Sequence, residues 1–106
     1  MKIAVDMDNT IFTQGSPDAG YKNSHPIFEN IKIINELSKD NEIYIYTARH
    51  FNHFQLTKRQ LEEAGVIHHG LILGKFNYDI LIDDKALNAD LLEDKELLFK
   101  KINDSK

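Results

Sequence analysis

Four short apolar runs limit the fold of this chain more than any other feature. They cover residues 2–5, 42–46, 71–73 and 79–82, and each is rich in Ile, Val, Leu or Tyr. Near-continuous apolar runs of this length are typical of strands in a parallel sheet that is covered on both faces. The chain is therefore expected to contain four buried strands.

The stretches between these runs carry helical patterns. Pro26 suits a first helical turn, and the apolar residues after it recur at helical spacing. Further helices are predicted over about 52–64, with Gly65 as a stop, and over about 94–102. This order favours an α/β fold, a three-layer Rossmann-like parallel sheet with helices on both faces. Residues 11–25 lack periodicity and are expected to form a flexible loop or flap.

Composition narrows the functional class. A length of 106 residues suits a single domain over 1–106. The chain has no cysteine, which excludes disulfides and thiolate metal sites. The net charge of −4 and the lack of an obvious basic face disfavour nucleic acid as a partner. The first residues resemble neither a signal peptide nor a membrane span, so a cytoplasmic location is expected.

Polar residues follow each apolar run, and ligands of open parallel sheets bind beyond the carboxyl ends of the strands. Two carboxylates close together at the end of a buried strand normally have a cation beside them, because a buried unpaired carboxylate is costly. The sequence therefore predicts one polar site at this edge of the sheet. In chain order its residues are Asp6, Asp8, Thr47, Arg49, Lys75, Asp83 and Asp84.

The set resembles the four motifs of the haloacid dehalogenase (HAD) superfamily of phosphohydrolases. The first, Asp-x-Asp-x-Thr, is matched by residues 6–10, and the second, a Ser or Thr that closes the second strand, by Thr47. The third, a lysine, is matched by Lys75, and the fourth, an acidic pair after an apolar strand, by Asp83 and Asp84. Four motifs in the right order over residues 6–84 make a specific signal.

The resemblance implies a role for each motif residue. Asp6 would be the nucleophile that takes the phosphoryl group, and Asp8 would be the general acid and base. Thr47 would hydrogen-bond the phosphate, and Lys75 would neutralise its charge. Mg²⁺ would be bound by Asp6, Asp8 (through its backbone carbonyl), Asp83 and Asp84. Asp84 has an alternative role as a helix cap before residues 85–87.

Two further residues are predicted to contact substrate. Arg49 lies two residues beyond Thr47 and could reach a second anionic group, although a surface ion pair is an equal alternative. Asn9 stands inside the first motif, where many relatives carry glycine. Phe76 stands where proline is common, and both departures leave the subfamily open.

No folded insertion stands after the first motif or before Lys75, so the chain looks like a capless member. The expected function is Mg²⁺-dependent hydrolysis of a small phosphorylated metabolite such as a sugar phosphate. One alternative is a nucleotide or polynucleotide-end phosphatase, and another is a non-catalytic phosphate- or metal-binding regulatory module. An open site at this size also suggests a homo-oligomer, and the 11–25 loop is a candidate lid.

Overall fold

The computed structural model describes residues 1–76 and 78–106. The chain divides into two compact units, Met1–Phe76 and Asn77–Lys106, which are described separately. The first unit is a small α/β fold. It contains strands β1 (Lys2–Val5), β2 (Glu42–Tyr46) and β3 (Gly70–Ile72) and helices α1 (Phe28–Leu37) and α2 (Phe54–Glu63).

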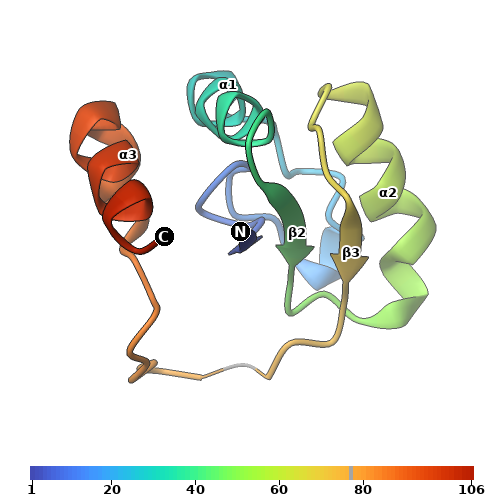
Figure 1. Ribbon diagram of the computed structural model, residues 1–106. Coiled ribbons are helices and arrows are strands. Elements are labelled where there is room, and N and C mark those ends of the chain that lie inside the picture. The colour runs from blue at the N-terminus through green and yellow to red at the C-terminus, as the bar shows by residue number, and fades with distance from the viewer. Residues whose placement is uncertain (77) are drawn as a thin grey trace. The chain divides into compact units, whose positions relative to one another are not determined.

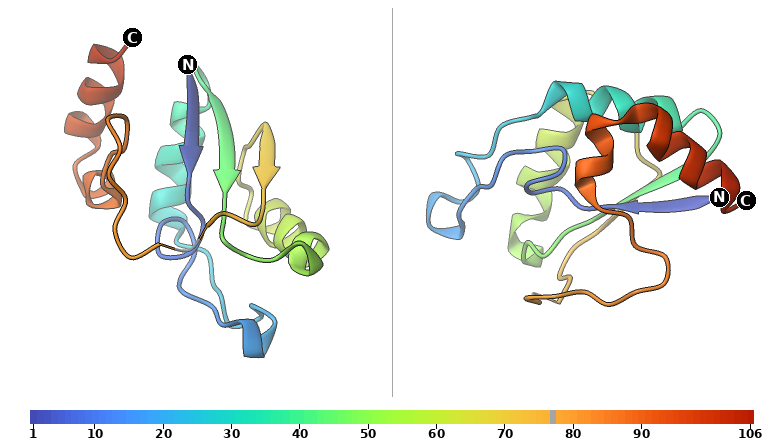
Figure 2. Two further views of the ribbon diagram at one scale, coloured as in Figure 1. Left: turned by 90° about the horizontal axis from the view of Figure 1, so that it is seen from below. Right: turned by 90° about the vertical axis from the view of Figure 1, so that its left-hand side faces the viewer.

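The three strands form one parallel sheet in the order β1-β2-β3, and Figure 2 shows them side by side and pointing the same way. The pairing aligns Val5 with Ile45 and Ile45 with Leu71. The carboxyl ends of all three strands therefore meet at one edge of the sheet. This confirms the parallel α/β prediction for the first three apolar runs.

One face of this sheet carries most of the core. Ile43 and Ile45 are completely buried, whereas Tyr46 and Ile72 on the opposite face are 38% and 49% exposed. Parallel strands joined by right-handed crossovers in sequential order place both connecting helices on the same face. Helix α1 connects β1 to β2, and α2 connects β2 to β3 (Figure 1). The buried apolar residues of these helices are Ile31, Ile34 and Leu37 on α1 and Leu61 on α2.

Helix boundaries follow local chemistry. Pro26 lies two residues before the first residue of α1, so that helix begins slightly later than predicted. Gly65 follows α2 with φ +74°, the left-handed conformation that ends many helices and that glycine adopts without strain. A short 3-10 helix, Phe51–His53, precedes α2.

The second unit contains a 3-10 helix, Ala89–Glu93, and helix α3 (Lys95–Asp104). The side chain of Asp94 accepts a hydrogen bond from the Leu97 amide and so caps α3, whose predicted position is confirmed. Leu98 and Ile102 are the buried residues of this helix.

The predicted fourth strand over 79–82 is wrong. These residues have no strand assignment, and the side chains of Ile80 and Ile82 are 80% and 95% exposed. A strand exists only through pairing, and in the part of the chain that the structure describes this run pairs with none. Its apolar composition indicated strand propensity but not a partner. The helical layer on a second face, and with it the Rossmann-like arrangement, stays a prediction.

No helix in residues 1–76 and 78–106 combines the length and apolar character needed to cross a membrane.

The central position of β2 gives a test of the core. Ile45→Val removes one methylene from a completely buried side chain and is expected to lower the free energy of unfolding by about 0.5–1.5 kcal/mol. The matched Ile72→Val substitution, at the half-exposed position on β3, is expected to change the free energy of unfolding by no more than about 0.5 kcal/mol. Urea unfolding of the two variants measures both values, and equal losses would contradict the assignment of the buried face.

Candidate functional site

The turn after β1 presents the two aspartates of the first motif. The carbonyl of Met7 accepts hydrogen bonds from the amides of Thr10, Ile11 and Phe12, at 3.2, 3.0 and 3.0 Å. Ile11 and Phe12 are 0% and 1% exposed, so the far end of the turn is anchored in the core. This tight turn holds Asp6 and Asp8 at the carboxyl edge of the sheet.

Asn9 occupies the sharpest point of this turn. Its φ is +64°, a left-handed value that Asn tolerates better than most residues other than glycine. Its side-chain amide donates to Oε1 of Gln14 at 2.7 Å. Glycine would meet the same backbone requirement, so Asn9 has a conformational reason to be present apart from its predicted contact with substrate.

Lys75 is brought to Asp6 by the turn after β3. Gly74 has φ +79° and donates its amide to the Arg49 carbonyl at 2.9 Å, and the Lys75 amide donates to the Thr47 carbonyl at 3.0 Å. These bonds tie the turn after β3 to the turn after β2. The Nζ atom of Lys75 then lies 3.9 Å from Oδ2 of Asp6. Two residues far apart in the sequence, which the motifs predicted to act together, therefore form an ion pair.

The electrostatics of Asp6 reflect its partial burial. Desolvation raises the pKa of the Asp6 carboxyl above its ordinary value, and the charge of Asp8 acts in the same direction. The Lys75 ammonium and a hydrogen bond from the Met7 amide, 2.9 Å from Oδ1, oppose this rise in pKa. The ionised form of Asp6 is thus kept at some cost, which a second cation would reduce.

Thr47 closes β2 and is completely buried. Its Oγ1 accepts a hydrogen bond from the Arg49 amide at 3.3 Å, and its own amide donates to the Ile72 carbonyl. A hydroxyl that accepts one bond can still donate its proton. Its predicted bond to phosphate stays a prediction.

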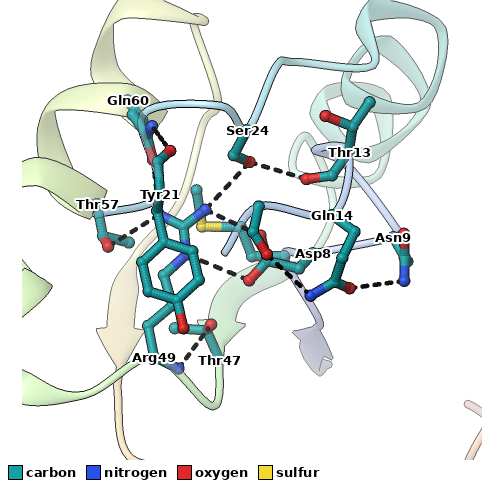
Figure 3. Close-up of polar contacts among 12 residues, drawn as sticks. Asp8, Asn9, Thr13, Gln14, Tyr21, Ser24, Thr47, Arg49, Thr57 and Gln60 are labelled. Carbon is teal, nitrogen blue, oxygen red and sulfur yellow. Dashed lines mark hydrogen bonds and ion pairs between the residues drawn. The ribbon is translucent and has the colours of Figure 1, made fainter. Parts of the chain in front are cut away.

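Arg49 lies in a different environment from the one predicted. Its side chain is 0% exposed, and Nη2 and Nε donate to Oδ1 and Oδ2 of Asp8 at 2.9 and 3.2 Å. Nη1 donates to Thr57 and Gln60, and Nη2 also donates to Ser24, as Figure 3 shows. Every guanidinium N–H is thereby used within the protein. A surface ion pair does not fit this burial, so that alternative for Arg49 is wrong. The predicted contact of Arg49 with a substrate anion stays a prediction.

The residues around Arg49 were missed in the sequence. Thr57 is completely buried on α2, between Phe54 and Leu61 at helical spacing. A threonine within an apolar stripe was the available signal for a buried polar partner. Ser24 and Tyr21 gave no such signal, because they belong to the irregular segment 11–25.

That segment is tied to the site at several points. It contains a 3-10 helix, Pro17–Ala19, and Ser24 donates its hydroxyl to the Thr13 carbonyl at 2.9 Å. The Tyr21 carbonyl accepts from Nε2 of Gln60 at 2.9 Å. The Tyr21 ring stacks on the Arg49 guanidinium, with 4.3 Å between Cζ and the ring centroid (Figure 3). Closure of this segment over the site stays a prediction.

The fourth motif lies in the second unit. Oδ1 of Asp83 accepts a hydrogen bond from the Lys85 amide at 2.7 Å, which is a local turn. No helix begins at residues 85–87, so the alternative role of Asp84 as a helix cap there is wrong. The structure places these two aspartates in the Asn77–Lys106 unit and the other motif residues in the Met1–Phe76 unit.

The donor set at Asp6 is of the type that Mg²⁺ prefers. The first unit offers the Asp6 carboxylate and the Asp8 carbonyl, both hard oxygen donors. Within the described ranges, no three His, Cys, Asp or Glu side chains come together as a metal cluster. The chemistry of the donors therefore fits Mg²⁺, while the other predicted ligands, Asp83 and Asp84, belong to the second unit.

Comparison with known proteins identifies a structural relative. A crystal structure of a protein from Vibrio cholerae superimposes with a TM-score of 0.71, covers 94% of this chain and 97% of its own, and is 24% identical. At that identity the likeness establishes the fold alone. No family model matches the sequence, and no curated protein matches it either.

The raised pKa of Asp6 predicts how stability changes in Asp6→Asn. Above the folded-state pKa the wild-type protein carries a partly desolvated charge that the variant lacks, so the variant is expected to unfold at a higher temperature near pH 7. The difference should shrink as pH falls toward about 3.9, the ordinary aspartate pKa, because Asp6 then becomes neutral. Thermal unfolding across this pH range measures the difference in unfolding temperature between variant and wild type. A variant less stable than wild type at neutral pH would contradict desolvation of Asp6 as the cause of its raised pKa.

Proposed function

We propose that this protein is a phosphomonoester hydrolase that works through an aspartyl-phosphate on Asp6, with Mg²⁺ as cofactor and a small phosphorylated metabolite as substrate. The observation that carries the proposal is the 3.9 Å pair between Asp6 and Lys75 at the carboxyl edge of a parallel sheet. The pair joins the first and third motifs of the HAD resemblance. A nucleophilic carboxylate beside a cation is suited to an anionic substrate.

Phosphoryl transfer would proceed in two steps. In the first, a carboxylate oxygen of Asp6 forms a bond to phosphorus while the bond to the leaving oxygen breaks, and that oxygen takes a proton from Asp8. In the second, water attacks phosphorus, gives a proton to Asp8, and releases Asp6 and inorganic phosphate. Acid–base help of this kind contributes about 10² to 10⁴ in rate.

The remaining motif residues have supporting roles in this proposal. Lys75 neutralises negative charge on the phosphoryl group, and Thr47 donates a hydrogen bond to it. Bound Mg²⁺, held by Asp6, the Asp8 carbonyl, Asp83 and Asp84, would supply further charge neutralisation. The tight turn that positions Asp6 and Asp8 provides the alignment on which phosphoryl transfer depends most.

Two exposed phenylalanines give the nucleotide alternative a specific basis. Phe76 directly follows Lys75 and is 81% exposed. Phe51 is 68% exposed and lies against Gly74, where a Cβ would come within 3.3 Å of its ring. Aromatic rings of this kind can stack on a nucleobase. Nucleotides are therefore the second substrate class to test.

Hydrolysis of p-nitrophenyl phosphate tests the reaction type. The wild-type protein with Mg²⁺ is expected to release p-nitrophenol, and Asp6→Asn is expected to remove this activity because an amide does not attack phosphorus. Asp40→Asn is the matched control, since Asp40 is exposed and precedes β2 at the opposite end of the sheet. Full activity in Asp6→Asn would refute the nucleophile, and a wild-type protein that binds phosphate without turnover would support a binding module instead.

The same assay examines the proposed metal ligands. Asp83→Asn and Asp84→Asn are expected to raise the Mg²⁺ concentration needed for half-maximal activity. An unchanged Mg²⁺ dependence in both variants would remove these residues from the ligand set.

A panel of sugar phosphates and nucleoside monophosphates tests the substrate class. The proposal predicts higher kcat/KM for one or more sugar phosphates. If nucleotides are preferred, Phe51→Ala and Phe76→Ala should raise KM for nucleotides more than for p-nitrophenyl phosphate. Such a preference would make nucleotides the proposed substrate class in place of sugar phosphates, and the proposed reaction type would be unchanged.

A further inference from the structure

Arg49 has a fully satisfied and fully buried guanidinium. The five bonds described above use its five N–H donors, two on Asp8 and one each on Ser24, Thr57 and Gln60. Burying an ion is expensive unless it is completely paired. The guanidinium is therefore held in one position by the protein itself.

The four partner residues belong to three separate parts of the first unit. Asp8 lies on the turn after β1, Ser24 on the 11–25 segment, and Thr57 and Gln60 on α2. The three bonds to Ser24, Thr57 and Gln60 hold the guanidinium, and its other two bonds reach Asp8 (Figure 3). The scaffold thus positions Arg49, and Arg49 in turn positions Asp8.

The contact with Asp8 has the geometry of a positioning device. Two bonds to the two carboxylate oxygens fix both the place and the plane of the carboxyl group. Each carboxylate oxygen can accept two hydrogen bonds, so Arg49 leaves part of the capacity of Asp8 unused. The Asp8 side chain is also 16% exposed, whereas that of Arg49 is not exposed at all. Asp8 can therefore meet a substrate while Arg49 holds it.

We propose that Arg49 is a positioning residue for the acid–base carboxylate of Asp8, braced by Ser24, Thr57 and Gln60, and that it does not bind substrate. This inference rests on the proposed phosphatase function, and it adds a residue and three supporting side chains to that site. Its consequence is specific. Loss of the contact between Arg49 and Asp8 should impair proton transfer to the leaving oxygen more than it impairs attack by Asp6.

Leaving groups of different basicity separate these two effects. A p-nitrophenolate leaves without much help from an acid, whereas an alkoxide needs a proton as the bond to phosphorus breaks. The ratio kcat/KM reports the steps up to the first irreversible one, which includes departure of the leaving group. A variant in which the general acid is displaced should therefore lose more kcat/KM as the leaving group becomes more basic.

The experiment compares Arg49→Lys with wild type on p-nitrophenyl phosphate, phenyl phosphate and an alkyl phosphate, with Mg²⁺ present. The lysine retains the charge but loses the two-bond contact with Asp8. The expected loss in kcat/KM is roughly tenfold or less for p-nitrophenyl phosphate and about 10² to 10³ for the alkyl phosphate. The matched control is Arg59→Lys, the other arginine of the chain, which is exposed on α2 and should change neither value.

A second variant keeps the test decisive if Arg49→Lys does not fold. Thr57→Val preserves the shape of a buried side chain and removes one brace while the Asp8–Arg49 pair remains. The loss in kcat/KM of this variant should also grow with leaving-group basicity, but it should be smaller than that of Arg49→Lys. The circular dichroism spectrum of the variant should match that of the wild-type protein.

The outcomes are distinguishable. An equal loss on all three substrates in the folded variants would make Arg49 merely structural and overturn this inference while the proposed function stands. A lower kcat/KM that arises only from a higher KM would return Arg49 to substrate binding and also overturn it. A wild-type protein that hydrolyses none of the substrates would overturn the proposed function and this inference together.

Discussion

Parallel pairing of β1, β2 and β3 is the constraint on which the candidate site depends. Because Val5, Ile45 and Leu71 are aligned across the sheet, the residues just beyond each strand come to one edge. Asp6, Thr47 and Lys75 each follow a different strand. The amides of Gly74 and Lys75, bonded to carbonyls beyond β2, then fix the last turn. Without this alignment the 3.9 Å approach of Lys75 to Asp6 would have no structural cause.

The Asp8–Arg49 pair links stability to the chemistry of the site. Breaking a buried pair by removing one partner typically costs about 3–5 kcal/mol, because the other charge is left uncompensated. In this protein the pair also joins the turn after β1 to α2 and to the 11–25 segment. The side chain that stabilises the packing of these parts is thus the one that fixes the orientation of Asp8.

The sequence predicted features that depend on local pattern. The first three strands, the stop at Gly65 and the position of α3 follow from apolar periodicity and backbone preference. The proximity of Asp6 and Lys75 followed from strand order. The environment of Arg49 was not predicted, because it depends on three segments that meet only in the folded chain. Thr57 within the apolar stripe of α2 was a partial signal.

The error over residues 79–82 has a related cause. An apolar run shows that a segment favours burial, but pairing with a neighbouring strand is a tertiary property. The exposed side chains of Ile80 and Ile82 are the consequence in the described chain. The roles of Asp83 and Asp84 rested on that strand and on the family resemblance, so they stay predictions. The Asp6–Lys75 pair does not depend on the predicted strand over residues 79–82.

Rapid acid quench of the protein during turnover, followed by peptide mass spectrometry, tests the central claim most directly. The account predicts a transient phosphoryl group on the peptide that contains Asp6, absent in Asp6→Asn and lost again as substrate is exhausted. Turnover with the phosphoryl group on another residue, or with none on the Asp6 peptide at any quench time, would contradict it.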